Sequence, residues 1–201
     1  MERSRTMRGP LILSNDNIKC NSKNHIGSIM RVNIIIGRFQ PITTGHLKCM
    51  EEAYKKGFKT VICMIETVNP DKRHPFPSNM LFDLYDYTNV PFIEDIILVK
   101  SADIVKIGQT LKEKGYEIAS WTCGTDRYKD YKRMTDKYAE QAELSNDFEL
   151  IEIPRTDEDV SATKVRKALI EHDVSTFNSL YPFDNKVEAY EVLEKQIGSV
   201  I

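Results

Sequence analysis

A loop whose residue types suit an anion site follows the first apolar run of the sequence. Val32–Ile36 ends at Gly37, and a glycine at a strand end lets the backbone approach a ligand closely. A helical pattern begins near Gly45 and His46, so the unpaired N–H groups and the positive dipole end of that helix face the loop. Thr43 and His46 are three residues apart, a spacing that lets both side chains point donors at one phosphate chain. The loop has neither the dinucleotide pattern GxGxxG nor the phosphate-loop pattern GxxxxGK followed by Ser or Thr.

A second set of phosphate-binding residue types follows the last apolar run, which ends at Ile153. Ser161 is a natural N-cap for the next helix. Thr163 and Arg166 stand in the first turns of that helix, where backbone N–H groups still point outward. Hydroxyls, a guanidinium and a helix start together suit the terminal phosphates of a nucleoside triphosphate. On its own, the pattern S-x-T-x-x-R equally describes a capped amphipathic helix.

Short apolar runs alternate with helical stripes between and around these two loops. The runs that predict strands are 32–36, 61–65, 96–99, 118–123 and 148–153. Apolar residues recur at spacings of three and four within 47–58, 104–111, 128–142 and 187–197. This alternation predicts an α/β fold, a Rossmann-like open parallel sheet of about five strands with helices on both faces. Ligands on such sheets bind beyond the carboxyl ends of the strands, which is where both loops lie.

Composition and charge exclude several classes of protein. The 201 residues are 41% hydrophobic and 29% charged, with a formal net charge of -2, which excludes a disordered or collagen-like chain. The chain has no overall excess of basic residues, so its charge does not indicate a nucleic-acid partner. No apolar run approaches the ~20 residues of a membrane helix, so we expect no membrane partner.

The N-terminal stretch differs from the remainder of the chain. Residues 1–29 are largely polar and carry no helix or strand period, and we interpret them as a flexible arm or a non-native extension. Residues 30–201 are predicted to form one domain with C-terminal helices. The cysteines, Cys20, Cys49, Cys63 and Cys123, have neither CxxC nor zinc spacing. Without a secretory pattern, these features predict reduced thiols and a cytoplasmic protein.

The two loops resemble the paired signatures of the HxGH-type nucleotidyltransferase superfamily. The first signature reads His or Thr, any residue, Gly, His, and stands here as Thr43-Thr44-Gly45-His46. The second reads Ile-Ser-x-Thr-x-x-Arg, with Val160 in place of Ile. The segment GRFQP resembles nicotinamide-mononucleotide adenylyltransferases, whereas PITTGHL is more similar to pantetheine-phosphate adenylyltransferases. Gly124 and Asp126 resemble the Gly-x-Asp segment near the nucleotide, although Asp126 is alternatively a helix N-cap. The resemblance covers roughly residues 30–182.

Three further residues have a functional and a structural interpretation each. The loop 66–78 is rich in proline and charge; it is either solvated surface or a flap similar to one in mononucleotide adenylyltransferases, with Arg73 as the phosphate contact. Asp103 either reaches the acceptor substrate or caps a helix. Trp121 is either a core residue or a stacking platform for a base. We predict all three as acceptor-binding residues.

The resemblance implies transfer of a nucleotidyl group from a nucleoside triphosphate to an acceptor phosphate, with release of pyrophosphate. An acceptor phosphate is already an anionic nucleophile, so the reaction needs no general base. The implied catalytic residues are His46, Thr43 and Arg166. The implied nucleotide-binding residues are Gly37, Arg38, Phe39, Gln40, Gly45, Gly124, Asp126, Ser161 and Thr163. No protein metal site is predicted, and Mg²⁺ is expected to be held mainly by substrate phosphates and water.

Several substrates and one non-catalytic role remain as alternatives. The partners we expect are ATP and a small phosphorylated acceptor, first nicotinamide mononucleotide in NAD biosynthesis. Phosphopantetheine is the second acceptor, and a cytidylyltransferase using CTP is the third alternative. A nucleotide-binding regulatory or assembly protein is an alternative of another class. The resemblance also leaves a homo-oligomer open.

Overall fold

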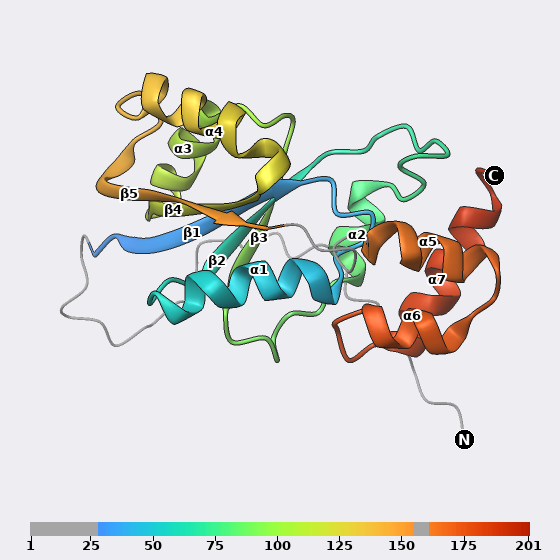
Figure 1. Cartoon of the computed structure of the whole chain (residues 1–201). Helices are drawn as coiled ribbons and strands as arrows, with labels where there is room; N and C mark the ends of the chain where they lie inside the picture. Colours follow the sequence, from blue (N-terminus) through green and yellow to red (C-terminus); the bar gives the residue numbers. More distant parts are fainter. Residues whose placement is uncertain (1–27, 155–160) are drawn as a thin grey trace, which may run out of the picture.

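A five-stranded parallel sheet forms the centre of the computed structural model, which describes residues 28–154 and 161–201 (Figure 1). The strands are β1 (Met30–Gly37), β2 (Thr60–Ile65), β3 (Ile93–Val99), β4 (Tyr116–Gly124) and β5 (Leu144–Ile153). Their spatial order is β3-β2-β1-β4-β5, and every neighbouring pair is parallel. The chain runs outward from β1 to β3 and then returns to the other side of β1 for β4. The order therefore reverses between β1 and β4, which is where open α/β sheets bind ligands.

Helices cover both faces of this sheet (Figure 1). They are α1 (Thr44–Lys55), α2 (Ser78–Leu84), α3 (Ile104–Glu113), α4 (Thr125–Tyr138), α5 (Ser161–Ile170), α6 (Val174–Leu180) and α7 (Lys186–Gly198). One core gathers Ile35 with residues of α1, α2 and α5 to α7. The other gathers Val32 and Ile34 with residues of α3 and α4. Because β1 buries side chains in both cores, its sequence is nearly continuously apolar. The predicted fold class is confirmed.

Two short helices were not predicted from the sequence. α2 and α6 have seven residues each, too few to show a helical period. α6 begins after Asp173, whose carboxylate accepts the backbone N–H of Thr176 at 3.1 Å, an ordinary N-cap contact. The predicted arm, 1–29, lies outside the described residues except for its last two, and β1 begins at Met30.

The described part of the chain contains no helix long and apolar enough to cross a bilayer. Cys49, Cys63 and Cys123 are free thiols, and Cys63 and Cys123 are buried. Burial raises the pKa of Cys123 to about 11, so this thiol stays protonated and poorly nucleophilic near neutral pH.

Candidate functional site

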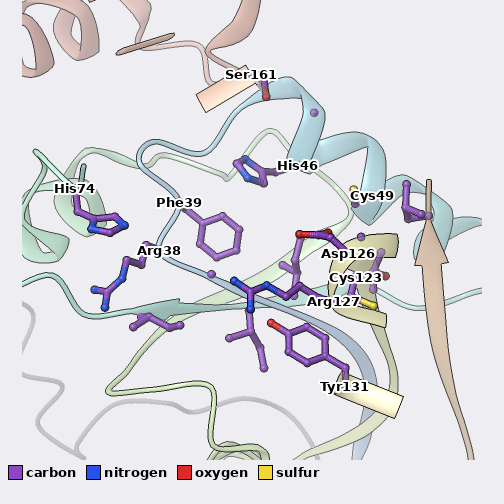
Figure 2. A pocket seen from close by; sticks show the side chains of 18 residues that line it. Arg38, Phe39, His46, Cys49, His74, Cys123, Asp126, Arg127, Tyr131 and Ser161 are labelled. Atoms are coloured by element: carbon purple, nitrogen blue, oxygen red, sulfur yellow. The ribbon is translucent and has the colours of Figure 1, made fainter. Parts of the chain in front are cut away.

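A cavity of about 450 Å³ lies at the carboxyl ends of β1 and β4. Both predicted loops contribute to its wall, together with the start of α4 (Figure 2). The first loop supplies Gly37, Arg38, Phe39, Gly45 and His46. Ser161 of α5 and Gly124 and Asp126 at the β4–α4 junction complete the predicted residues that line it. The structure therefore brings three segments that are far apart in sequence to one cavity at the sheet's reversal point.

The His46 imidazole is held in one orientation by the loop that precedes it. Thr43 is the N-cap of α1, and its backbone N–H donates to Nδ1 of His46 over 2.9 Å. This is half of a capping box, with His46 in the position usually held by Glu or Gln. Phe39 packs against the imidazole edge-on, with ring centroids 5.0 Å apart. Because Nδ1 accepts a backbone N–H, the neutral ring carries its proton on Nε2.

Thr43 does not line the cavity, contrary to the expectation that it points a donor at a phosphate. Its side chain is fully buried, and its hydroxyl shares a hydrogen bond with the hydroxyl of Ser161. This contact joins the two signature segments directly. Gly45 makes the contact sterically feasible, because a Cβ at Gly45 would lie 2.9 Å from Ser161 Oγ. Thr43 thus positions His46 and Ser161.

Arg166 ties α5 to the first loop from a second point. Its Nη1 donates to the backbone carbonyl of Gln40 at 2.7 Å, and its Nη2 donates to Thr163 Oγ1 at 3.2 Å. Partial burial lowers the pKa of Arg166, yet the guanidinium remains charged at neutral pH. Neither Arg166 nor the exposed Thr163 lines the cavity.

Gln40 connects the first loop to the loop 66–78 and does not face the cavity. Its side chain is buried. Nε2 donates to the carbonyl of Phe76 at 2.7 Å, and Oε1 accepts the N–H of Phe76 at 2.9 Å. The side-chain amide thus pairs with the backbone of Phe76 through one donated and one accepted hydrogen bond, as a neighbouring strand would. Arg38 reinforces it by donating to the carbonyl of Glu66 at 2.8 Å. Gln40 and Arg38 therefore fix the loop 66–78 against the first loop.

His74, rather than the predicted Arg73, is the residue of this loop that lines the cavity. Arg73 is exposed and lies outside the lining. The pKa of His74 is lowered, first by burial and then by the positive charge of Arg38. Arg166 and Arg73 lower it further, and Asp71 opposes them. His74 is therefore neutral near neutral pH and lies in positive surroundings.

Trp121 and Asp103 do not reach the cavity. Trp121 has no exposed surface and stacks on Tyr131, with ring centroids 4.1 Å apart and planes at 23°. A contact with an acceptor would require the indole to leave the core. Asp103 is the N-cap of α3, where its carboxylate accepts the N–H groups of Val105 and Lys106 at 3.1 and 3.2 Å. Trp121 is therefore a core residue and Asp103 a helix cap, which are the structural alternatives given for them above.

Several lining residues were not predicted from the sequence. Cys49 follows His46 by one helical turn on α1, and Cys123 lies near the end of β4. The sequence predicts both as core residues because their neighbours are apolar. Arg127 and Tyr131 lie four residues apart on α4 and line the opposite side. That spacing places both on one helix face, a signal that the sequence contained.

The described residues of the lining include few groups that commonly bind metal ions. Among the residues that the structure describes, Asp126 is the one carboxylate in the lining. Throughout residues 28–154 and 161–201, no group of three or more His, Cys, Asp or Glu side chains is arranged to hold an ion.

Comparisons with known proteins give a family match and structural neighbours. Residues 34–168 match a family model described as cytidylyltransferase-like. No curated protein matched the sequence. The nicotinic acid mononucleotide adenylyltransferase of Plasmodium falciparum, complexed with APC, is 16% identical, with 84% of this chain and 98% of that chain covered and a TM-score of 0.51. A candidate nicotinate-nucleotide adenylyltransferase from Vibrio parahaemolyticus is 14% identical, with 82% and 91% covered and a TM-score of 0.52. Identities this low indicate a shared fold alone.

Proposed function

We propose that this chain, which belongs to the cytidylyltransferase-like family of nucleotidyltransferases, transfers AMP from ATP to a small phosphorylated acceptor, nicotinamide mononucleotide first. The products would be NAD and pyrophosphate. One observation carries the proposal: the hydrogen bond between Thr43 and Ser161 joins both signature segments at the wall of one cavity. Two helices, α1 and α5, begin at that junction, and their N-termini favour phosphate groups.

The triphosphate fits the side of the cavity where positive charge gathers. Arg38 and His74 line it there (Figure 2), and Arg166 lies close enough to lower the pKa of His74. A polyanion would offset the mutual repulsion of the Arg38 and Arg166 guanidinium groups. In this proposal Arg38, His74 and Ser161 contact the β- and γ-phosphates, and Arg166 holds the loop that presents them.

His46 acts on the α-phosphate. Because its Nδ1 accepts the backbone N–H of Thr43, the neutral ring carries its proton on Nε2. A donor aimed at an oxygen where charge develops stabilises the transition state without reorganisation. Thr43 and Phe39 hold the imidazole before the substrate arrives, which reduces the entropic cost of alignment.

The acceptor phosphate attacks the α-phosphorus as an anion, so no residue has to remove a proton. A P–O bond to the acceptor oxygen forms, the bond to the β-phosphate oxygen breaks, and pyrophosphate leaves with the electron pair. Mg²⁺ carried by the triphosphate would neutralise charge on the leaving group. The chain's own contribution is orientation, hydrogen bonding from His46 and positive charge from Arg38 and Arg166.

The choice of a pyridine mononucleotide rests on two likenesses. The segment GRFQP resembles nicotinamide-mononucleotide adenylyltransferases. Structural neighbours include proteins named as nicotinic acid mononucleotide and nicotinate-nucleotide adenylyltransferases. Nicotinamide and nicotinate mononucleotides carry the same phosphate, so both belong in the test.

Pyrophosphate release with Mg²⁺ tests the proposal. ATP and CTP are each combined with nicotinamide mononucleotide, nicotinate mononucleotide, phosphopantetheine or glycerol 3-phosphate. We expect turnover with ATP and a pyridine mononucleotide. Turnover with another pair would retain the chemistry and refute the acceptor. If folded protein releases no pyrophosphate with any pair, the enzymatic proposal is contradicted. Thermal stabilisation of that sample by a nucleotide would then favour a binding protein.

A further inference from the structure

Arg127 is a cavity-lining cation to which none of the roles above is assigned. It stands in the first turn of α4, directly after β4. Tyr131, one helical turn later, lines the same wall. In Figure 2 both side chains project from α4 and lie on the far side of Phe39 from His46 and Ser161. Arg127 therefore lies across the cavity from the junction of the two signature segments.

The arginines near the cavity differ in how their guanidinium groups are used. Arg38 donates to the Glu66 carbonyl, and Arg166 donates to the Gln40 carbonyl. Arg127 makes no hydrogen bond and no ion pair with any side chain or backbone group in the described part of the chain. A guanidinium carries five N–H donors in a planar fork that matches carboxylate and phosphate oxygens. Those donors are available to a ligand.

The wall beside Arg127 holds the carboxylate of Asp126 and the aromatic ring of Tyr131. Tyr131 stacks on Trp121, which is fully buried. Burial also raises the pKa of Tyr131, so the phenol remains neutral and does not compensate the charge of Arg127. A fixed aromatic ring next to an uncommitted guanidinium suits a ligand that carries an oxyanion.

We propose that Arg127 binds an oxyanion of the acceptor. This inference rests on the proposed function, in which two polyanions must share one cavity. The triphosphate is assigned to the side with Arg38, His74 and Ser161, and a second anion brought close to it needs a cation of its own. The oxyanion is either the acceptor phosphate or, in nicotinate mononucleotide, the ring carboxylate.

Steady-state kinetics on the full chain separate acceptor binding from ATP binding. Arg127→Ala should raise the KM for the acceptor by at least about tenfold while the KM for ATP stays within about twofold. Arg127→Lys should recover part of the loss, because lysine restores charge without the planar fork. Arg133→Ala is the matched control: Arg133 lies on the same helix, is highly exposed and pairs loosely with Asp130 at 3.9 Å. A loss confined to the KM for ATP overturns the assignment.

Calorimetric titration without ATP gives a readout independent of turnover. The probes are nicotinamide mononucleotide, nicotinate mononucleotide and inorganic phosphate. Equal weakening of both mononucleotides by Arg127→Ala identifies the phosphate as the partner, and weakening of nicotinate mononucleotide alone identifies the carboxylate. Unchanged affinities, or no binding of any probe to the unsubstituted protein, overturn the inference. If binding depends on Arg127 but no acceptor turns over, the proposed function fails and the anion site stands.

Discussion

Adding one methyl group at Gly45 tests whether the contact between the two signature segments organises the site. The Cβ of Gly45→Ala would lie 2.9 Å from Ser161 Oγ but 3.6 Å from Thr43 Oγ1 and 3.8 Å from Ser161 Cβ. Only the first separation is too short for a carbon and an oxygen. Ser161 must therefore rotate or move, and its buried hydrogen bond to Thr43 is lost.

The magnitude follows from two opposing terms. Losing a buried hydrogen bond and leaving its partner unsatisfied costs about 1–3 kcal/mol. Replacing glycine by alanine inside a helix returns up to about 1 kcal/mol. Gly45→Ala should lower the free energy of unfolding by about 1 kcal/mol, and kcat should fall because the start of α5 moves relative to His46.

A double-mutant cycle with Ser161→Ala isolates the contact. Without Ser161 Oγ, the new methyl meets only ordinary van der Waals neighbours, so Gly45→Ala should be neutral or stabilising in that background. Urea denaturation of the four proteins should give a coupling energy of about 1–3 kcal/mol. Gly198→Ala, where a Cβ would meet nothing within 4 Å, is the control for helix propensity. Additive effects of Gly45→Ala and Ser161→Ala would refute the reasoning.

Three other substitutions separate catalytic, charge-sensing and structural roles. His46→Ala should reduce kcat by about 100- to 1000-fold through loss of one preorganised donor, with an unchanged circular dichroism spectrum; near-native turnover would remove His46 from the mechanism. His74 has a lowered pKa in the free protein, and a bound triphosphate favours its protonated form. The affinity for ATP should therefore rise as the pH falls from neutral into the acidic range, relative to the affinity of His74→Gln. The exposed His172→Gln, outside the cavity lining, should retain the pH profile of the unsubstituted protein, and parallel profiles for all three proteins would contradict the role of His74. Trp121→Phe removes a buried indole N–H that has no partner among the described residues; stability should change by about 1 kcal/mol or less, because the smaller ring leaves a void while the unsatisfied donor disappears. The acceptor KM of Trp121→Phe should stay within about twofold, and a tenfold rise would place the indole in the site.

The strands, the longer helices and the family were predictable because their signals are local. β1 must be apolar on both sides to fill two cores, and such a run is visible without knowledge of its partners. The loop that ends in His46 follows directly on that run, so motif and element support each other. The match over residues 34–168 confirms the family prediction.

The use of individual side chains was less predictable, because it depends on neighbours distant in sequence. The sequence predicts that Gln40 binds a nucleotide, but in the fold the backbone of Phe76 forms hydrogen bonds with both the nitrogen and the oxygen of its side-chain amide. Arg73 and His74 are adjacent in sequence, yet only the fold decides which of them faces the cavity. Thr43 has its partner in Ser161, 118 residues away.

Isotope tracing of the transferred group tests the central claim most directly. The acceptor mononucleotide is prepared with ¹⁸O in its phosphate and incubated with ATP, Mg²⁺ and the protein. The masses of the products are then measured by mass spectrometry. If the acceptor phosphate attacks the α-phosphorus, the dinucleotide retains every ¹⁸O atom, including the bridging one, and the pyrophosphate carries none. Label in the pyrophosphate, or ATP consumption without a dinucleotide, would contradict the account.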